Sequence, residues 1–203
     1  MTYYCYQTPK LLESPLTHRL SAIYKTTENR VSIFSNYPCV RQHETFDKYT
    51  SICVELATPI GNLLIYGTII GINGNRHPSF KYDIVRQCED FKKLSAAGNL
   101  CICGDFNCSF ADNYYFTKYG RDTLEQVFSD NKISLLTRDQ PECIDHIAVS
   151  QNFITNGNIT VAEWNFDKSL SDHKGTIADI CFPRDSNTKS FKDESAGISF
   201  ATL

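Results

Sequence analysis

The stretch from residue 62 to residue 103 constrains the fold most, because its pattern is that of two strands joined by a helix. Asn62–Ile70 contains a continuous apolar run, which is typical of a strand buried on both faces. Apolar residues at helical spacing predict a helix over Phe80–Ala97, and Gly98 follows it as a helix-ending glycine. The apolar run Leu100–Cys103 predicts the second strand. Such a unit holds parallel strands, so the sequence predicts an α/β fold.

Other patterns extend this sheet. Thr58–Gly61 has the residues of a tight turn and predicts an antiparallel hairpin, which makes the sheet mixed. The remaining predicted elements are strands at Arg30–Ser35, Ser51–Leu56, Ile133–Leu136, Ile144–Val149, Ile159–Trp164 and Gly175–Cys181, and a helix at Arg121–Asn131. Residues 1–29 lack periodicity and are expected to form loops. After Pro183 the sequence is polar, so we expect one domain over residues 1–183 and a flexible C-terminal tail over residues 184–203.

The composition is that of a globular protein, with 41% hydrophobic and 21% charged residues among 203. A net charge of −3 excludes a chain-wide basic surface of the kind that supports non-specific nucleic-acid binding. Nine cysteines, an odd number, favour a reducing compartment over a disulfide framework. The first residues lack a signal-peptide pattern, and the longest apolar stretch, Leu63–Ile72, is too short to span a bilayer. We therefore expect a cytoplasmic monomer with no membrane association.

A polar cluster, Gly104-Asp105-Phe106-Asn107, ends the strand predicted at Leu100–Cys103. Asp105 and Asn107 are two residues apart, so at a strand end both side chains point the same way. A carboxylate that can accept a proton, beside an amide that can orient a ligand, is expected where water is activated next to a phosphate. The alternative is an Asx-turn that only caps the strand.

Two later clusters add groups that fit the same chemistry. Asp145 interrupts the apolar strand Ile144–Val149, and a buried carboxylate is costly without a partner. His173 can be that partner, since a buried Asp fixes the imidazole tautomer and keeps the ring protonated, ready to donate to a phosphoryl oxygen. Asp172 beside it is a hard oxygen ligand of the kind that Mg²⁺ prefers. All these residues lie at strand ends or in loops, where α/β sheets commonly place their sites.

A zinc site is the alternative for the cysteines near the first cluster. Cys101, Cys103 and Cys108, together with His146, supply thiol and imidazole ligands of the kind that zinc takes. No second Cys-x-x-Cys or His pair completes the pattern, and Cys101 and Cys103 fall in a strand, where a free thiol behaves as a small buried apolar group. The sequence therefore favours buried thiols over a zinc module.

Three motifs, in this order along the chain, resemble those of the endonuclease/exonuclease/phosphatase superfamily, whose fold is DNase I-like. They are Gly104-Asp105-Phe106-Asn107, Ile144-Asp145-His146-Ile147 and Ser171-Asp172-His173. Arg30–Pro38 is also similar to a strand and turn of that family. The resemblance covers roughly residues 30–181 and implies a four-layer α/β sandwich with mixed β-sheets. It also implies hydrolysis of a phosphoester that depends on Mg²⁺, or on Mn²⁺ in its place.

The resemblance implies a role for each of five residues. Asp105 would activate the attacking water, and Asn107 would orient that water or the phosphate. Asp145 would hold His173, which would stabilise the charge of the transition state. Asp172 would ligate the metal ion, and the metal would polarise the phosphoryl group during in-line attack.

Two departures from the family pattern leave the function open between two classes. The family's N-terminal strands, one bearing Asn and one ending in Gln-Glu, have no match here, so the domain resembles an N-terminally truncated one. Ile69 stands where the family has a His or Tyr, and Asn73 or His77 is a nearby substitute. One expectation is an endonuclease or exonuclease acting on phosphodiesters, with nucleic acid favoured over an inositol phosphate or another phosphoester. The other is a catalytically weak or inactive relative that serves as a binding module, or a gene fragment.

Overall fold

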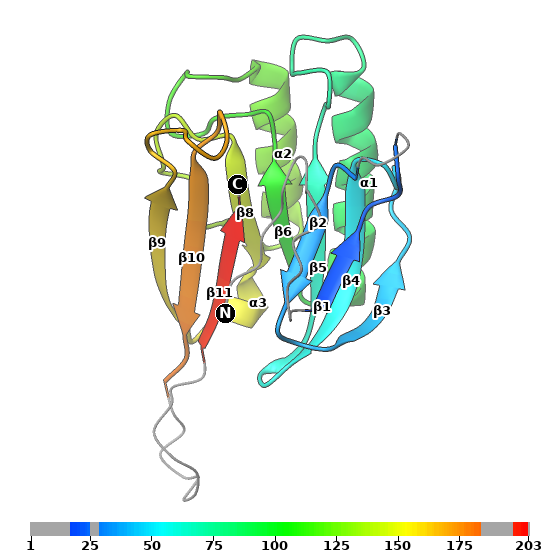
Figure 1. Cartoon of the computed structure of the whole chain (residues 1–203), viewed down its shortest axis with the longest axis vertical. Coiled ribbons are helices and arrows are strands. Elements are labelled where there is room, and N and C mark those ends of the chain that lie inside the picture. The colour runs from blue at the N-terminus through cyan, green and yellow to red at the C-terminus, as the bar shows by residue number, and fades with distance from the viewer. Residues whose placement is uncertain (1–16, 25–28, 184–196, 203) are drawn as a thin grey trace, which may run out of the picture.

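The computed structural model describes residues 17–24, 29–183 and 197–202, and its centre is a six-stranded sheet (Figure 1). In spatial order its strands are β3 (Cys39–His43), β4 (Ser51–Thr58), β5 (Gly61–Ile69), β6 (Leu100–Asp105), β8 (Asp145–Ser150) and β7 (Ile133–Leu135). Strands β5 and β6 are parallel and the other neighbours are antiparallel. The predicted α/β fold with a mixed sheet is therefore confirmed.

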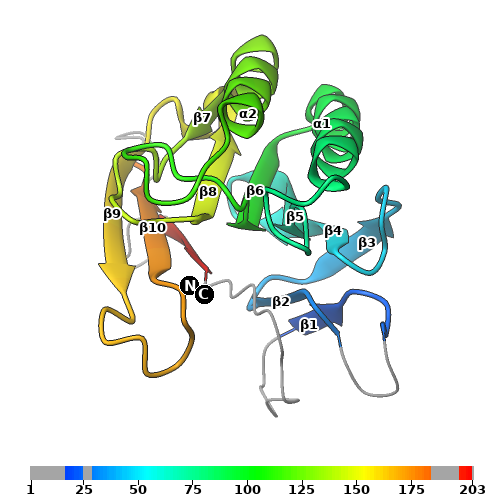
Figure 2. The ribbon, with the colours of Figure 1, turned by 90° about the horizontal axis from the view of Figure 1, so that it is seen from above.

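Helices α1 (Phe80–Ala97) and α2 (Lys118–Asp130) cover one face of this sheet (Figure 2). Their apolar sides pack on aromatic side chains of the sheet, and the ring of Phe91 lies edge-on to that of Tyr66, with centroids 5.1 Å apart. A short helix, α3 (Gln151–Ile154), follows β8. None of the helices in the described ranges is long and apolar enough to cross a membrane.

Helix α2 begins three residues earlier than the predicted position at Arg121. The reason is a cap, because the side chain of Thr117 accepts a hydrogen bond from the backbone N–H of Gly120 at 3.0 Å. Such a cap satisfies one of the N–H groups that the first turn leaves without a partner. The polar capping residue therefore sets the start of α2 ahead of its first apolar residue.

The other face of the large sheet packs against two smaller antiparallel sheets. They are formed by β1 (Thr17–Leu20) with β2 (Ser32–Ser35), and by β9 (Asn158–Trp164), β10 (Gly175–Cys181) and β11 (Gly197–Thr202) in the order β11-β10-β9. The core between the layers is apolar and includes Ile33, Ile65 and Phe200. The described residues thus form a helical layer, a large sheet and a second layer of strands, and no described helix covers the outer side of that second layer (Figure 2).

The flexible tail predicted for residues 184–203 is wrong for Gly197–Thr202, which form β11. Ile198 and Phe200 point into the core and are buried, while the backbone pairs antiparallel with β10 along its whole length. The apolar alternation is short and follows a polar stretch, so the sequence pattern alone did not reveal it. Residues 184–196 lie outside the described ranges.

Two further strands differ from expectation. β1 lies within residues 1–29, where loops are predicted, and pairs antiparallel with β2. β3 is exposed at Val40, Arg41 and Gln42 and has no apolar face that a sequence pattern could reveal. Pairing with β4 holds it at the sheet edge, and Arg41 forms an ion pair with Glu55 at 2.7 Å. Backbone pairing rather than side-chain burial therefore decides that β3 is a strand.

Truncation of Phe200 to alanine tests whether β11 is part of the folded core. The ring is fully buried, so Phe200→Ala should lower the free energy of unfolding by about 3–5 kcal/mol. Urea denaturation followed by circular dichroism measures this change. Phe166→Ala is the matched control, because that residue is 67% exposed and its loss should change stability by less than about 0.5 kcal/mol. Equal stabilities for the two variants would show that β11 is not packed in solution.

Candidate active site

Strands β6 and β8 bring two buried carboxylates together. Asp105 and Asp145 are paired residues in the antiparallel register of these strands, and they are 4% and 1% exposed. Gly104 precedes Asp105 with φ of +135°, and a Cβ atom there would lie 2.0 Å from the carbonyl oxygen of Thr68 on β5. Only glycine permits this close approach of β5 and β6. The sharp bend at Gly104 therefore fixes where Asp105 emerges at the end of the strand.

Asn107 forms the turn directly after β6, and its side-chain nitrogen donates hydrogen bonds to other groups of the protein. Its φ of +49° lies in the left-handed region, which Asn tolerates. Its backbone N–H donates to Oδ1 of Asp105 at 2.7 Å, so the Asx-turn of the alternative interpretation is present. Its Nδ2 donates to Oδ2 of Asp105 at 3.0 Å and to the carbonyl of Ile70 at 2.9 Å. In this orientation Asn107 offers its side-chain oxygen, an acceptor, to a ligand.

The predicted contact between Asp145 and His173 is present. Nδ1 of His173 lies 2.7 Å from Oδ2 of Asp145, and their side chains are 15% and 2% exposed. Burial by itself would lower the pKa of His173. The hydrogen bond to Asp145 and its charge, with the charges of Asp105 and Asp172, outweigh burial and raise that pKa to about 9. The ring is therefore an imidazolium at neutral pH, held through Nδ1 with Nε2–H as its second donor.

The carboxyl group of Asp105 is difficult to ionise. Burial raises its pKa most, and the charge of Asp145 raises it further. The charge of His173 and the hydrogen bond from Asn107 oppose these effects, and the outcome is a pKa of about 8. A carboxyl group with such a pKa can exchange a proton near neutral pH, which is the property that a general base needs.

These shifts predict that the fold loses stability as the pH rises. The pKa of His173 is raised from 6.5 to about 9, so its contribution is fully present below pH 6.5 and is lost as the pH rises through 9. Asp105 acts in the same direction, because the folded chain keeps a proton that the unfolded chain releases above pH 3.8. Urea denaturation in EDTA should therefore give a lower free energy of unfolding at pH 8 than at pH 6.5. The decrease should be smaller in His173→Gln, and an equal decrease would contradict the assignment.

Asp172, the predicted metal ligand, lies at the edge of this cluster. Its side chain is 90% exposed, and its Oδ1 lies 3.9 Å from Nε2 of His173. Within the described ranges, no group of three or more His, Cys, Asp or Glu side chains is arranged to hold a metal ion. One exposed carboxylate, with a neighbouring Asp105 that resists ionisation, does not make a complete site for Mg²⁺. A Mg²⁺ ion would need ligands beyond those that the described residues supply.

The zinc alternative does not fit the structure around His146. Nδ1 of His146 lies 2.8 Å from the hydroxyl of Thr137, and Nε2 lies 2.9 Å from the carbonyl of Cys108. Burial lowers the pKa of this ring to about 4, so it is neutral. The thiols of Cys101 and Cys103 are buried in the core, with their sulfurs 3.3 Å apart. His146 therefore joins β8 to the chain after β6, and both of its nitrogens are already used.

Asn75 lies beside the site, although no sequence motif singles it out. It is 4% exposed, its Nδ2 donates to the carbonyl of Asn107 at 2.8 Å, and its backbone N–H donates to the hydroxyl of Tyr115 at 3.3 Å. The two substitutes considered for Ile69, Asn73 and His77, lie in the same loop but are exposed. The sequence signal that could have pointed to Asn75 is the pair Gly74-Asn75 in the loop that follows β5, because loops at strand ends often carry site residues. Asn75 supports the turn that Asn107 makes.

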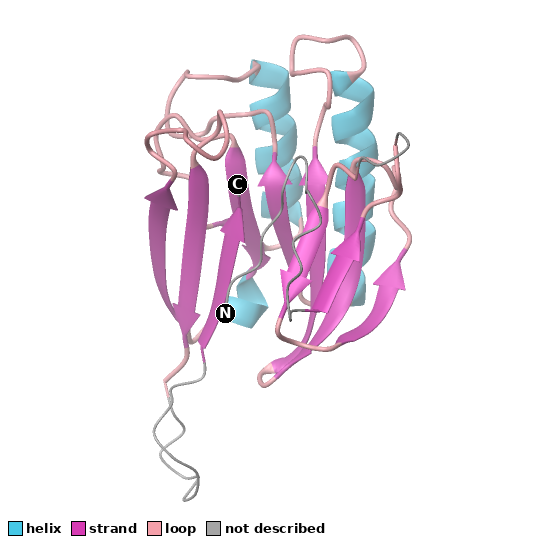
Figure 3. Cartoon of the chain, viewed as in Figure 1, coloured by secondary structure: helices cyan, strands magenta, loops and turns pink. Residues whose placement is uncertain are grey.

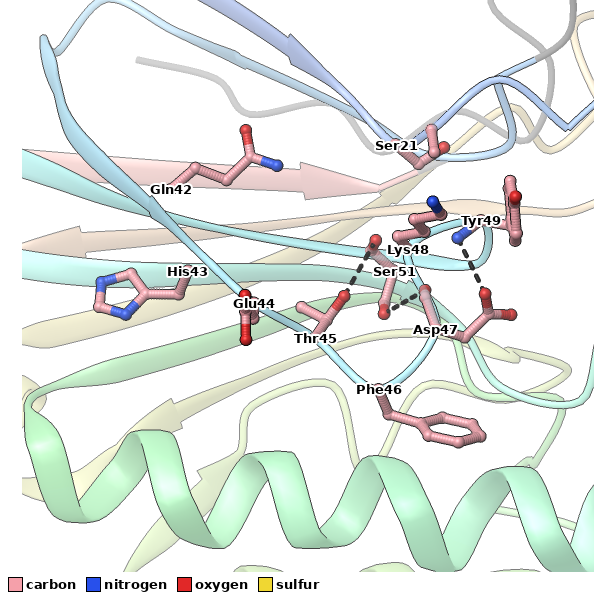
Figure 4. A pocket seen from close by; sticks show the side chains of 11 residues that line it. Ser21, Gln42, His43, Glu44, Thr45, Phe46, Asp47, Lys48, Tyr49 and Ser51 are labelled. Carbon is pink, nitrogen blue, oxygen red and sulfur yellow. Dashed lines mark hydrogen bonds between the residues drawn. The ribbon is translucent and has the colours of Figure 1, made fainter.

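A cavity of about 770 Å³ lies elsewhere, over β3 and β4 (Figure 4). Its lining includes the β3–β4 connection, where Thr45 and Asp47 bond to Ser51, and Asp47 also accepts the N–H of Tyr49. None of the predicted site residues lines it. The hydrogen bonds of its polar groups stabilise that loop. The acidic cluster, formed by Asp105, Asn107, Asp145 and His173 at β6 and β8 with Asp172 at its edge, is therefore the better candidate for chemistry.

Comparisons with known proteins bear on the fold. No protein-family model and no curated protein matches the sequence. Among solved structures, the endonuclease domain of TRAS1, a telomere-specific non-LTR retrotransposon, matches with a TM-score of 0.65 at 13% identity, over 86% of this chain and 83% of that chain. Staphylococcus aureus beta toxin matches with a TM-score of 0.48 at 16% identity, over 85% and 76% of the two chains. The human Nocturnin catalytic domain matches with a TM-score of 0.46 at 10% identity, over 90% and 69%.

At these identities, the match to the TRAS1 domain is informative about the fold alone. That match spans most of both chains, and it includes most of the mixed sheet and long helices that Figure 3 shows. The chain has a DNase I-like fold, the one it shares with the TRAS1 endonuclease domain.

Proposed function

We propose that this chain hydrolyses phosphodiester bonds, with nucleic acid as the favoured substrate and with Mg²⁺ or Mn²⁺ as metal ion. The observation that carries the proposal is the contact of His173 with Asp145 beside the turn formed by Asp105 and Asn107. Three separate segments of the chain thereby meet in one site. The fold supports the same class, because an endonuclease domain shares it.

The site residues can divide the work of hydrolysis among themselves. His173 can donate from Nε2 to a phosphoryl oxygen as negative charge develops there, while Asp145 holds the ring. Asn107 can accept a hydrogen bond from the attacking water through Oδ1. Asp105 can take the proton of that water as its oxygen bonds to phosphorus and the opposite ester bond breaks. Burial raises the pKa of Asp105 toward neutrality, which suits proton exchange, and Asp145 raises the pKa of His173, which suits a proton donor.

Metal dependence is a separate part of the proposal. Asp172 is the carboxylate that would contribute to a Mg²⁺ site, and a bound cation would supply positive charge to the phosphoryl group. The described residues do not complete the ligand set. The metal requirement is therefore tested directly, by measuring cleavage over a range of Mg²⁺ and Mn²⁺ concentrations and in EDTA.

Plasmid cleavage by wild-type protein and by Asp105→Asn tests the proposal. Loss of the base should reduce the rate by about a hundredfold or more. The variant should still fold, because a neutral amide avoids the burial of a carboxylate that is difficult to ionise. Asp139→Asn is the matched control, because Asp139 is exposed and lies outside the site. Equal rates for all three proteins would remove the proposal.

A second candidate is a catalytically weak relative that binds its ligand without turning it over. The observation in its favour is that the described residues hold no group of three metal ligands. Calorimetric titration with Mg²⁺ separates the two candidates. Tight stoichiometric binding that depends on Asp172 counts against the weak relative, and undetectable binding together with no cleavage supports it.

A further inference from the structure

The loop between β9 and β10, residues 165–174, displays the two most exposed large apolar residues of the described ranges. Phe166 is 67% exposed and Leu170 is 69% exposed. Figure 2 shows this loop projecting away from the sheets. Two large apolar side chains exposed on one short loop make that loop a candidate contact surface.

The loop is held in one shape by Asn165, which is itself 9% exposed. Nδ2 of Asn165 donates to the carbonyls of Ser171 and His173, at 3.0 and 2.6 Å, and its Oδ1 accepts the N–H of Leu170 at 3.1 Å. Asn165 also has φ of +57°, a left-handed conformation that Asn tolerates. The exposure of Phe166 and Leu170 is therefore built into an ordered loop, and that loop is tied directly to His173.

The loop also reaches the segment that follows Asn107. Nζ of Lys168 lies 5.9 Å from the ring centroid of Tyr114, which is 51% exposed. A cationic group of one loop and an exposed ring of the other thus lie next to each other. One loop carries Asp172 and His173 and the other follows Asn107, so this surface lies beside residues of the candidate active site.

Given the proposed function, we infer that the loop binds an unpaired nucleotide beside the phosphodiester that is cleaved, with Phe166 stacked on its base. An exposed ring stacks on the face of any base, and Lys168 can contact a backbone phosphate. We favour a nucleotide over a membrane surface because Asn165 ties this loop directly to the backbone of His173, the residue proposed to act on the phosphodiester.

Equilibrium binding tests the inference without reference to catalysis. The probe is a fluorescent single-stranded oligonucleotide, compared with a strand of equal length in which every base is absent. Wild-type protein should bind the base-bearing strand more tightly, and Phe166→Ala should weaken that binding on the order of tenfold while leaving the abasic strand unaffected. Tyr82→Ala is the matched control, since Tyr82 is 61% exposed but lies on α1, on the other face of the large sheet. Equal affinities for the two strands in wild-type protein would overturn the inference.

Cleavage of the same two strands separates this inference from the proposed function. The inference predicts that Phe166→Ala raises KM for the base-bearing strand and leaves kcat within about twofold. If wild-type protein cleaves both strands with equal KM, base recognition by residues 165–174 is contradicted and the proposed hydrolase function still stands. Base-dependent binding without cleavage would retain the loop and reject the hydrolase. Sedimentation with phosphatidylcholine/phosphatidylserine vesicles that is lost in Phe166→Ala, with oligonucleotide binding unchanged, would reassign the loop to membranes.

Discussion

Replacing His173 with glutamine should reduce the rate of phosphodiester cleavage by about a thousandfold, with little change in KM. The reason is that the glutamine side chain is neutral at every pH, so no charged donor would meet the developing negative charge of the transition state. His173 carries that charge near neutral pH, because Asp145 raises its pKa to about 9. The measurement is kcat and KM on plasmid or on an oligonucleotide at fixed metal concentration.

The matched control is His77→Gln, which makes the same chemical change at an exposed histidine of the loop before α1. The ring of His77 contacts Ser79 and lies outside the acidic cluster, so the cleavage rate of this variant should stay within about twofold of wild type.

Asp145→Asn should lower kcat, because Asp145 orients His173. The double variant Asp145→Asn/His173→Gln should then be little slower than His173→Gln alone, because the effects of residues that act as a unit are not additive. Full additivity would show that Asp145 does not act through His173.

Replacing Gly104 with alanine should prevent stable folding. The residue has φ of +135°, and a Cβ atom would lie 2.0 Å from the carbonyl oxygen of Thr68, which belongs to the neighbouring central strand. Backbone cannot move aside as the end of a flexible side chain can, so β5 and β6 would have to separate in the middle of the core. We expect a loss of more than about 4 kcal/mol, which is a large share of the stability of a domain of this size. Soluble yield and urea denaturation measure it.

Gly61→Ala is the control that separates strain from collision. Gly61 also has a positive φ, +115°, but nothing lies within 4 Å of the position of its Cβ. This variant should fold and lose only about 1–3 kcal/mol from backbone strain. Similar losses for both variants would mean that the contact with Thr68 relaxes at little cost.

The elements that the sequence predicted correctly share a strong local signal. The apolar run of β6, the helical stripe of α1 and the hairpin at Thr58–Gly61 each depend on neighbours in the chain, so their pattern is visible without a fold. The contact between Asp145 and His173 was also predictable, because a carboxylate inside an apolar strand needs a partner. Residue type and spacing along the chain are enough to predict these features.

Features that the sequence did not reveal depend on contacts between distant segments. β3 is exposed and exists because β4 offers a backbone edge, and β11 follows a polar stretch yet packs Phe200 into the core. Asn75 resembles any other polar loop residue until the fold places its amide on the carbonyl of Asn107. Such residues become recognisable only through the partner that the tertiary structure supplies.

The sequence by itself determined which groups could perform chemistry, because the carboxylates, the amide and the imidazole sit in short motifs at the ends of apolar runs. Only the tertiary structure decided their chemical state. Burial between β6 and β8 raises the pKa of Asp105, and contact with Asp145 raises that of His173. Both effects come from low local polarity and from charges brought close by the fold, and neither can be calculated from positions along the chain.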